Sequence, residues 1–233
     1  KPHSDFRLFI TTEPHDDFPS VLLKSSLKIT VESPPGVKSN LVRTYATWDD
    51  AFLNQRSAAQ SQVMFGLAWF HAVAQERRNF LPQGWAKHYD FTAADIKSAA
   101  DIIQASMGPR DTDLDWISLR NVFEMAIYGG RIDHSQDLGI LHVLINRYFN
   151  REMLLTRQHA IFQNVGVPAT NNATEIVTML MTSLPDTDVP AILSLPANAD
   201  RFVQENAAAA NLDHLRTLKQ RTAQADSGID AWR

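Results

Sequence analysis

The sequence predicts a mostly α-helical fold with a small β part near its N-terminal end. From residue 37 onward, apolar side chains recur at the spacing of helices that bury one face. Only two short segments before that point, residues 6–12 and 27–32, are rich in residue types that favour strands. Hydrophobic residues make up 44% of the 233 residues, enough for a sizeable core. Cysteine is absent, which excludes disulfides and thiolate metal sites.

Residues 6–12 predict a buried strand that ends before Pro14, and residues 27–32 alternate as a second strand that ends at Pro34. Between them, a short helix is expected to begin at Pro19, whose fixed φ suits a first helical turn. Two strands alone make a marginal sheet. We therefore expect these two to complete a sheet whose other strands lie upstream, outside this sequence.

The rest of the chain is expected to be helical, without a further strand comparable to these two. Two helix starts carry caps: Thr92 is followed by Asp95, and Asn172 by Glu175, at the spacing of a capping box. The expected helices cover residues 37–48, 57–79, 92–107, 116–128, 137–149, 172–184 and 200–225, with loops at 80–91 and 156–170 and a proline-rich connector at 185–196.

Residues 70–85, FHAVAQERRNFLPQGW, form a structural corner around which the other segments are organised. An apolar helix ends here in Glu76, Arg77 and Arg78, and a Pro-Gln-Gly turn then leads into Trp85. The two arginines lie in the last helical turn, where cations stabilise the negative end of the helix dipole by about 0.3–1 kcal/mol. A buried ion pair and a solvated helix end are both open interpretations of this charged cluster.

The common nucleotide and metal motifs are missing. Neither G-x-x-x-x-G-K-[ST] nor G-x-G-x-x-G nor H-E-x-x-H occurs in the sequence. Gly129 and Gly130 precede Arg131 without a strand before them, so we interpret them as the end of a helix rather than a phosphate loop. His71 lies alone on an apolar helix, where a structural role is favoured over that of a ligand or base. No metal site is expected.

Charge and hydropathy argue against two further classes of partner. The formal net charge is -4, from 22 basic and 26 acidic side chains, without the basic stripe of a nucleic-acid binder. The longest nearly apolar run, residues 63–74, is shorter than the roughly 20 residues that a membrane span needs. We therefore expect neither nucleic-acid binding nor membrane insertion.

Several motifs, in order along the chain, resemble the C-terminal part of dynein heavy chains. They are HSDFRLFITTEP at residues 3–14, SPPGVKSNL at 33–41, WFHA, QERR and PQGW between 69 and 85, IYGGRID at 127–133, and LPD and LPANADR between 184 and 201. Within that family, the sequence around residues 77–85 and 126–133 is most similar to the cytoplasmic class that powers retrograde intraflagellar transport. Residues 151–170 match no motif of the family.

The resemblance implies the sixth AAA+ module of the motor ring. Residues 1–36 would carry the last two strands of its α/β large subdomain, residues 37–195 its α-helical small subdomain, or lid, and residues 196–233 a helical connector toward the C-terminal region. In this family the sixth module is a structural ring element. The resemblance therefore implies no catalytic residue and no cofactor in this segment, with ATP and Mg²⁺ bound by other modules. Thr12 stands where AAA+ modules keep a sensor residue that touches nucleotide.

Partners and location follow from the same resemblance. The neighbouring AAA+ modules and the C-terminal region of the same heavy chain are expected to contact this segment, whereas microtubules and dynein subunits would bind the parent chain. The expected location is the cytoplasm, on the cytoskeleton and in the cilium. Structural or interface roles are expected for His71, Glu76, Arg77, Arg78, Trp85, Gly129, Gly130 and Arg131.

Two other functions stay open beside the ring element. An independent interaction module would dock a partner helix along residues 57–79. A small-molecule enzyme would use His71 and Glu76 as acid and base. The ring hypothesis further expects the isolated segment to be poorly soluble or molten without the sequence upstream of it.

Overall fold

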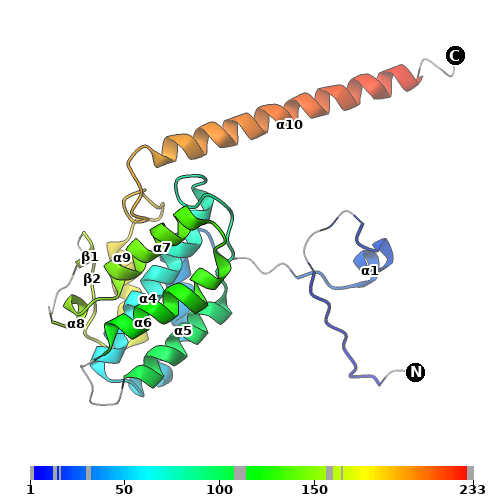
Figure 1. Cartoon of the computed structure of the whole chain (residues 1–233). Coiled ribbons are helices and arrows are strands. Elements are labelled where there is room, and N and C mark those ends of the chain that lie inside the picture. The colour runs from blue at the N-terminus through cyan, green and yellow to red at the C-terminus, as the bar shows by residue number, and fades with distance from the viewer. Residues whose placement is uncertain are drawn as a thin grey trace. The chain divides into compact units, whose positions relative to one another are not determined.

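The structure is a computed structural model that describes residues 3–12, 15, 17–29, 33–107, 114–155, 160–163 and 165–229. The chain separates into two compact units, Lys1–Ser33 and Pro34–Arg233. The elements, most of them labelled in Figure 1, are α1 (Ser20–Ser25), α2 (Val37–Thr47), α3 (Asp50–Asn54), α4 (Ala58–Glu76), η1 (Arg77–Asn79), α5 (Ala93–Ser106), α6 (Trp116–Val122), η2 (Phe123–Ile127), η3 (Gly129–Arg131), α7 (Ser135–Tyr148), α8 (Glu152–Leu155), β1 (Ala160–Phe162), β2 (Val165–Gly166), α9 (Ala173–Ser183) and α10 (Ala199–Ile229).

The first unit contains α1, which starts directly after Pro19 as predicted. The two strand predictions in this unit are not met. Residues 6–12 form no strand, and their large apolar side chains are exposed, with Phe9 at 88%. Of the second predicted strand, residues 27–29 are also outside any strand, and residues 30–32 lie outside the described part of the chain. A strand is stabilised by hydrogen bonds to a neighbouring strand, and the described residues offer none here.

The second unit is built around α4. Ser57 caps this helix: its Oγ accepts from the Gln60 amide, and the Gln60 Oε1 accepts from the Ser57 amide. Sixteen of the 19 residues of α4 are buried, so the helix is covered on nearly all sides. It contacts α2, α5, α7 and α8 (Figure 1). Because its own chain covers α4, no apolar face is left for a partner helix, which removes the interaction-module hypothesis.

The predicted helices between residues 37 and 184 are confirmed to within a few residues. Both predicted caps are present: the Asp95 carboxylate accepts from the Thr92 amide at 2.7 Å, and Asn172 Oδ1 accepts from the Glu175 amide at 3.1 Å. The predicted end of α5 at residues 108 and 109 lies outside the described residues. The short helix α3 was not predicted.

The start of α2 is capped from far along the chain. Its N-cap residue, Gly36, has φ of +94° and no side chain to cap with. The Asp188 carboxylate fills this role, accepting from the Val37 amide at 2.9 and 3.1 Å. Beside it, the Lys38 ammonium donates to Asp186 at 2.8 Å. These bonds join the first helix of the second unit to the connector before α10.

A small antiparallel hairpin, β1–β2, lies where the sequence predicted only a loop and no further strand. Its strands have three and two residues, too short for alternation to be visible in the sequence. Burial explains why it is ordered: Ile161 and Val165 are inside the core, and the ring of Phe162 stacks on Trp69 of α4 at a centroid distance of 6.4 Å.

The connector and α10 differ sharply in burial. In the connector, Ile192, Leu193 and Leu195 belong to the core. By contrast, α10 exposes the leucines at 212, 215 and 218, which the sequence predicted as its apolar side. Within the described residues, the side chains of this stripe are therefore largely accessible to solvent.

Candidate functional site at the end of α4

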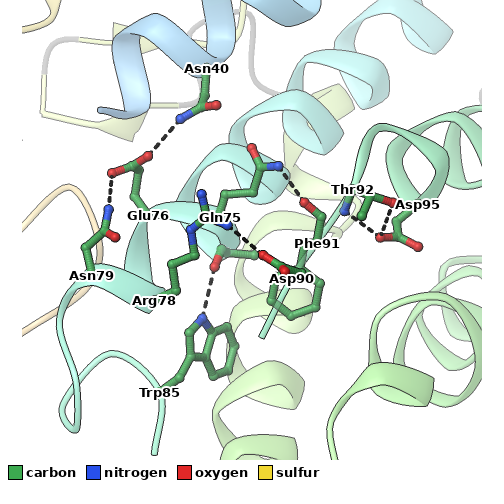
Figure 2. A network of polar contacts seen from close by, with 11 residues as sticks. Asn40, Gln75, Glu76, Arg78, Asn79, Trp85, Asp90, Phe91, Thr92 and Asp95 are labelled. Carbon is green, nitrogen blue, oxygen red and sulfur yellow. Dashed lines mark hydrogen bonds and ion pairs between the residues drawn. The ribbon is translucent and has the colours of Figure 1, made fainter. Parts of the chain in front are cut away.

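At the predicted corner, the backbone of the loop that follows α4 passes very close to the backbone at the end of that helix. The chain returns so closely that a Cβ built on Gly84 would lie 1.9 Å from the carbonyl oxygen of Arg77. Only glycine fits such an approach. The turn seats Trp85 in the core, fully buried, with its indole N–H donating to the Ala74 carbonyl at 2.9 Å (Figure 2).

Arg77 is the buried centre of this corner, with 4% of its surface exposed. Its Nε donates to the Gly84 carbonyl at 3.1 Å, and its Nη1 donates to Leu193 at 2.5 Å and, at 3.5 Å, to Ser194. The guanidinium lies 5.3 Å from the Trp85 ring centroid, within cation–π range. Burial lowers the pKa of Arg77 to about 10, so it stays charged at neutral pH. The described residues offer it no ion pair; it is stabilised by carbonyls of the loop and the connector.

Glu76 and Arg78 flank this arginine and differ from it in their partners (Figure 2). The two carboxylate oxygens of Glu76 accept from the side-chain amides of Asn40 at 2.8 Å and Asn79 at 2.9 Å. Arg78, whose side chain is 17% exposed, forms an ion pair at 2.8 Å with the exposed Asp90. Of the three charges in the cluster, Arg78 alone has an ion pair among the described residues.

Burial is also the main reason why the pKa of Glu76 is raised above its ordinary value of 4.5; the nearby Asp188 raises it further. A raised carboxyl pKa means that the folded state binds the proton more tightly than the unfolded state. The stability that the protonated Glu76 contributes is therefore complete below pH 4.5, the ordinary pKa, and is lost as the pH rises through the raised pKa of the folded state.

Glu76→Gln mimics the protonated carboxyl and should reveal this dependence. We expect the free energy of unfolding of the wild type, relative to this variant, to fall as the pH rises from 4.5 to 7, by up to about 1.4 kcal/mol per pH unit within the window between the two pKa values. Urea unfolding of both chains at several pH values measures it. A difference that stays constant or grows with pH would contradict the raised pKa.

Three further contacts close the loop 80–91 against its neighbours. Gln75 donates to the Phe91 carbonyl at 2.6 Å. Asp137, which is buried, accepts from the Ala86 amide at 2.9 and 3.1 Å and from the Tyr89 hydroxyl at 2.9 Å. Sequence reasoning missed Asp137, because an acid in the first turn of a helix is usually an exposed partner of the dipole.

Arg131 connects the start of α5 to η3. Its Nε and Nη2 donate to one oxygen of Asp95 at 2.8 and 2.7 Å. The other carboxylate oxygen of Asp95 accepts from the Thr92 amide in the cap of α5. Arg131 thus belongs to a polar connection within this unit.

Gly129 and Gly130 end the helix as predicted, but not through the left-handed conformation typical of a glycine cap. Gly36 is the one glycine with positive φ in the described part of the chain. The helix instead widens into the π-helix η2, in which the Tyr128 amide donates to the Phe123 carbonyl at 3.0 Å. This turn brings the carbonyl of Glu124 under Gly129, where a Cβ would approach it to 1.6 Å.

His71 and Glu76 have different hydrogen-bond partners and share none. The Nδ1 of His71 lies 3.1 Å from the hydroxyl of Tyr128, whereas Glu76 is bonded to Asn40 and Asn79. Burial lowers the pKa of His71 to about 3, which leaves the imidazole neutral at physiological pH. An acid–base pair must reach the same reacting group. These separate contacts give the enzyme hypothesis no support.

The remaining candidate, Thr12, lies exposed in the coil of the first unit. In the described ranges, no three His, Asp or Glu side chains gather in a way that could hold a metal ion. Across the same residues, none of the helices combines the length and the apolar character needed to cross a membrane.

The class of the second unit follows from comparison with known families. Residues 60–199 match the dynein heavy chain AAA lid domain. This range extends from the first turn of α4 to the start of α10, so it includes the corner, most of its polar contacts and most of the core. Residues 60–199 therefore form an AAA lid domain of the dynein heavy chain type.

The chain belongs to the dynein heavy chain family and is a segment of a heavy-chain motor. It is similar to cytoplasmic dynein 2 heavy chain 1 of Tripneustes gratilla, with 39% identity over 224 residues, of Chlamydomonas reinhardtii, with 39% over 232 residues, and of Homo sapiens, with 37% over 224 residues. These alignments cover 94%, 98% and 94% of this chain. The chain spans 5% of the length of each of these relatives.

Proposed function

We propose that this chain provides the lid of the sixth AAA+ module in a dynein motor ring and carries out no chemistry itself. The observation that supports it best is Arg77, a buried cation that ties the end of α4 to the loop 80–91 and to the connector before α10. A unit joined in this way moves as one body, which suits the transmission of rotations between modules. ATP and Mg²⁺ would bind to other modules of the parent chain.

The proposed division of the chain follows the same assignment. Residues 1–36 would complete the large subdomain of the module, residues 37–195 would form the lid, and residues 196–233 would lead toward the C-terminal region. The apolar side chains that residues 6–12 expose, and the leucine stripe of α10, are suited to contacts with these neighbours in the same heavy chain. Microtubules and other dynein subunits would be bound elsewhere in the parent chain.

We further propose that the parent motor serves retrograde intraflagellar transport. The support is the resemblance of residues 77–85 and 126–133 to that class, together with the relatives that carry the name cytoplasmic dynein 2. The motor would then work in the cytoplasm and the cilium, on microtubules.

A motor that contains this segment with Arg77→Met tests the structural role. We expect it to retain ATP binding, while microtubule-stimulated hydrolysis and gliding velocity fall several-fold, because a loosened lid transmits motion poorly. Arg78→Met is the matched control and should stay close to wild type. Urea unfolding shows whether the Arg77→Met lid is destabilised. If it is, and microtubules still stimulate ATP hydrolysis as strongly as in the wild-type motor, the proposal is contradicted.

A further inference from the structure

The connector, which runs from α9 to α10 (Figure 1), is attached by its first half to the start of α2. The Asp188 carboxylate accepts from the Val37 amide at 2.9 and 3.1 Å. The Lys38 ammonium donates to Asp186 at 2.8 Å and to the Leu184 carbonyl at 3.3 Å. These bonds, the first attachment of the connector, fix the backbone where α2 begins.

The second half of the connector is attached to two other parts of the unit through Ser194 and its neighbour. Arg77, directly after α4, donates to the Leu193 carbonyl and, at 3.5 Å, to the Ser194 carbonyl. Arg147 of α7 donates to the Ser194 hydroxyl at 2.9 Å. This second attachment therefore lies between two arginines, shortly before α10 begins at Ala199.

Ser194 has a backbone conformation that residues with a side chain rarely adopt. Its φ is +56°, in the left-handed region. There the Cβ crowds the following carbonyl oxygen, so any residue except glycine is strained. Such a residue persists only where its surroundings hold it in place. The side chains of Leu193 and Leu195 are both in the core, and together with the two arginines they hold Ser194 in this conformation.

Hydrogen-bonded turns join the first attachment to the second. Directly after Asp188, the Val189 carbonyl accepts from the Ile192 amide at 3.0 Å. The next three amides, at residues 193–195, donate to carbonyls of residues 190 and 191 at 2.9–3.1 Å. Residues 188–195 therefore form one stiff segment, and a displacement at one end of such a segment is carried to the other end.

We propose that residues 188–195 act as a strap that couples the start of α2 to the start of α10. Ser194 is its switch point, which exchanges between the held left-handed conformation and a relaxed one in which both attachments are loosened. Coupling between two sites is reciprocal, so a weaker bond at either attachment also weakens the other. The strap depends on contacts within the second unit and on neither the class of dynein nor the module.

Amide hydrogen exchange in the full chain of 233 residues measures both attachments, relative to amides in the middle of α4 that report global unfolding. The Val37 amide reports on the first attachment, and the Leu195 amide reports on the second. Asp188→Ala should accelerate exchange at Leu195 about tenfold. Arg147→Met should accelerate exchange at Val37 several-fold. Arg78→Met, which removes an arginine that does not contact the strap, is the matched control and should change neither rate.

Two variants of Ser194 separate the strain from the lost hydroxyl. Ser194→Ala and Ser194→Gly both remove the acceptor of Arg147, but only glycine adopts the left-handed conformation without strain. We therefore expect the Val37 and Leu195 amides to exchange about fivefold more slowly in Ser194→Gly than in Ser194→Ala. Exchange at Leu195 that is unchanged in Asp188→Ala, exchange at Val37 that is unchanged in Arg147→Met, or exchange that is no slower in the glycine variant would overturn the proposal.

Discussion

Gly129→Ala is expected to lower the free energy of unfolding by at least about 3 kcal/mol. The added Cβ would lie 1.6 Å from the carbonyl oxygen of Glu124, and this neighbour is backbone, which cannot move aside by a rotamer change. The π-helix η2 would have to rearrange, and Tyr128, whose hydroxyl meets His71, is its next residue. Urea unfolding followed by circular dichroism measures the loss.

Gly130→Ala is the matched control, one residue further along the same turn. A Cβ at Gly130 meets nothing within 4 Å, and its φ is not in the left-handed region. Its stability should stay within about 0.5 kcal/mol of wild type. If the two variants were equally stable, the close approach beneath Gly129 would not be a real constraint on the fold.

Arg77→Met should destabilise the chain by about 3–5 kcal/mol. The methionine fills part of the space, but the buried carbonyls of Gly84 and Leu193 lose their donor. Each unsatisfied buried acceptor costs about 1–3 kcal/mol, and the connector loses its attachment to α4. The measurement is again the free energy of unfolding in urea.

Its control is the adjacent arginine. Arg78 makes an ion pair with Asp90, whose side chain is 69% exposed. Pairs of this kind contribute about 0–1 kcal/mol, so Arg78→Met should cost no more than that. A similar loss in both variants would indicate that the charge of the helix end, and not the buried network of Arg77, stabilises the corner.

The sequence predicts what depends on neighbours along the chain. Helical periodicity and the caps at Thr92 and Asn172 locate the helices, and the Pro-Gln-Gly turn before Trp85 marks the corner. The partners of Arg77, by contrast, could not be predicted from the sequence. Leu193 lies 116 residues further on and offers only a backbone carbonyl, which carries no sequence signature. The same holds for Asp188, which caps α2 from 151 residues away.

Two misses have a different physical origin. The π-helix η2 changes the hydrogen-bonding pattern without changing the apolar periodicity, so the sequence indicated an ordinary helix over residues 116–128. The strands predicted at residues 6–12 and 27–32 were expected to pair with strands upstream of this sequence, and residues 6–12 and 27–29 have no strand partner among the described residues. Local propensity indicates that a segment can form a strand, whereas pairing decides whether it does.

The structure limits the expectation that the isolated segment is poorly soluble or molten to its first unit. The second unit has a large core around α4, with α2, α5, α7 and α8 packed against it. Poor packing concerns the first unit, where the apolar side chains of residues 6–12 are exposed. We therefore expect the lid to unfold cooperatively even where the first unit is not ordered.

Hydrogen exchange of the Trp85 indole N–H tests most directly whether the corner holds the lid together. This proton is buried and bonded to the Ala74 carbonyl. In the wild-type chain it should exchange as slowly as the amides in the middle of α4, at a rate set by global unfolding. Arg77→Met should accelerate both together. Fast exchange of the wild-type indole, at the rate of the amides in residues 6–12, would contradict the account.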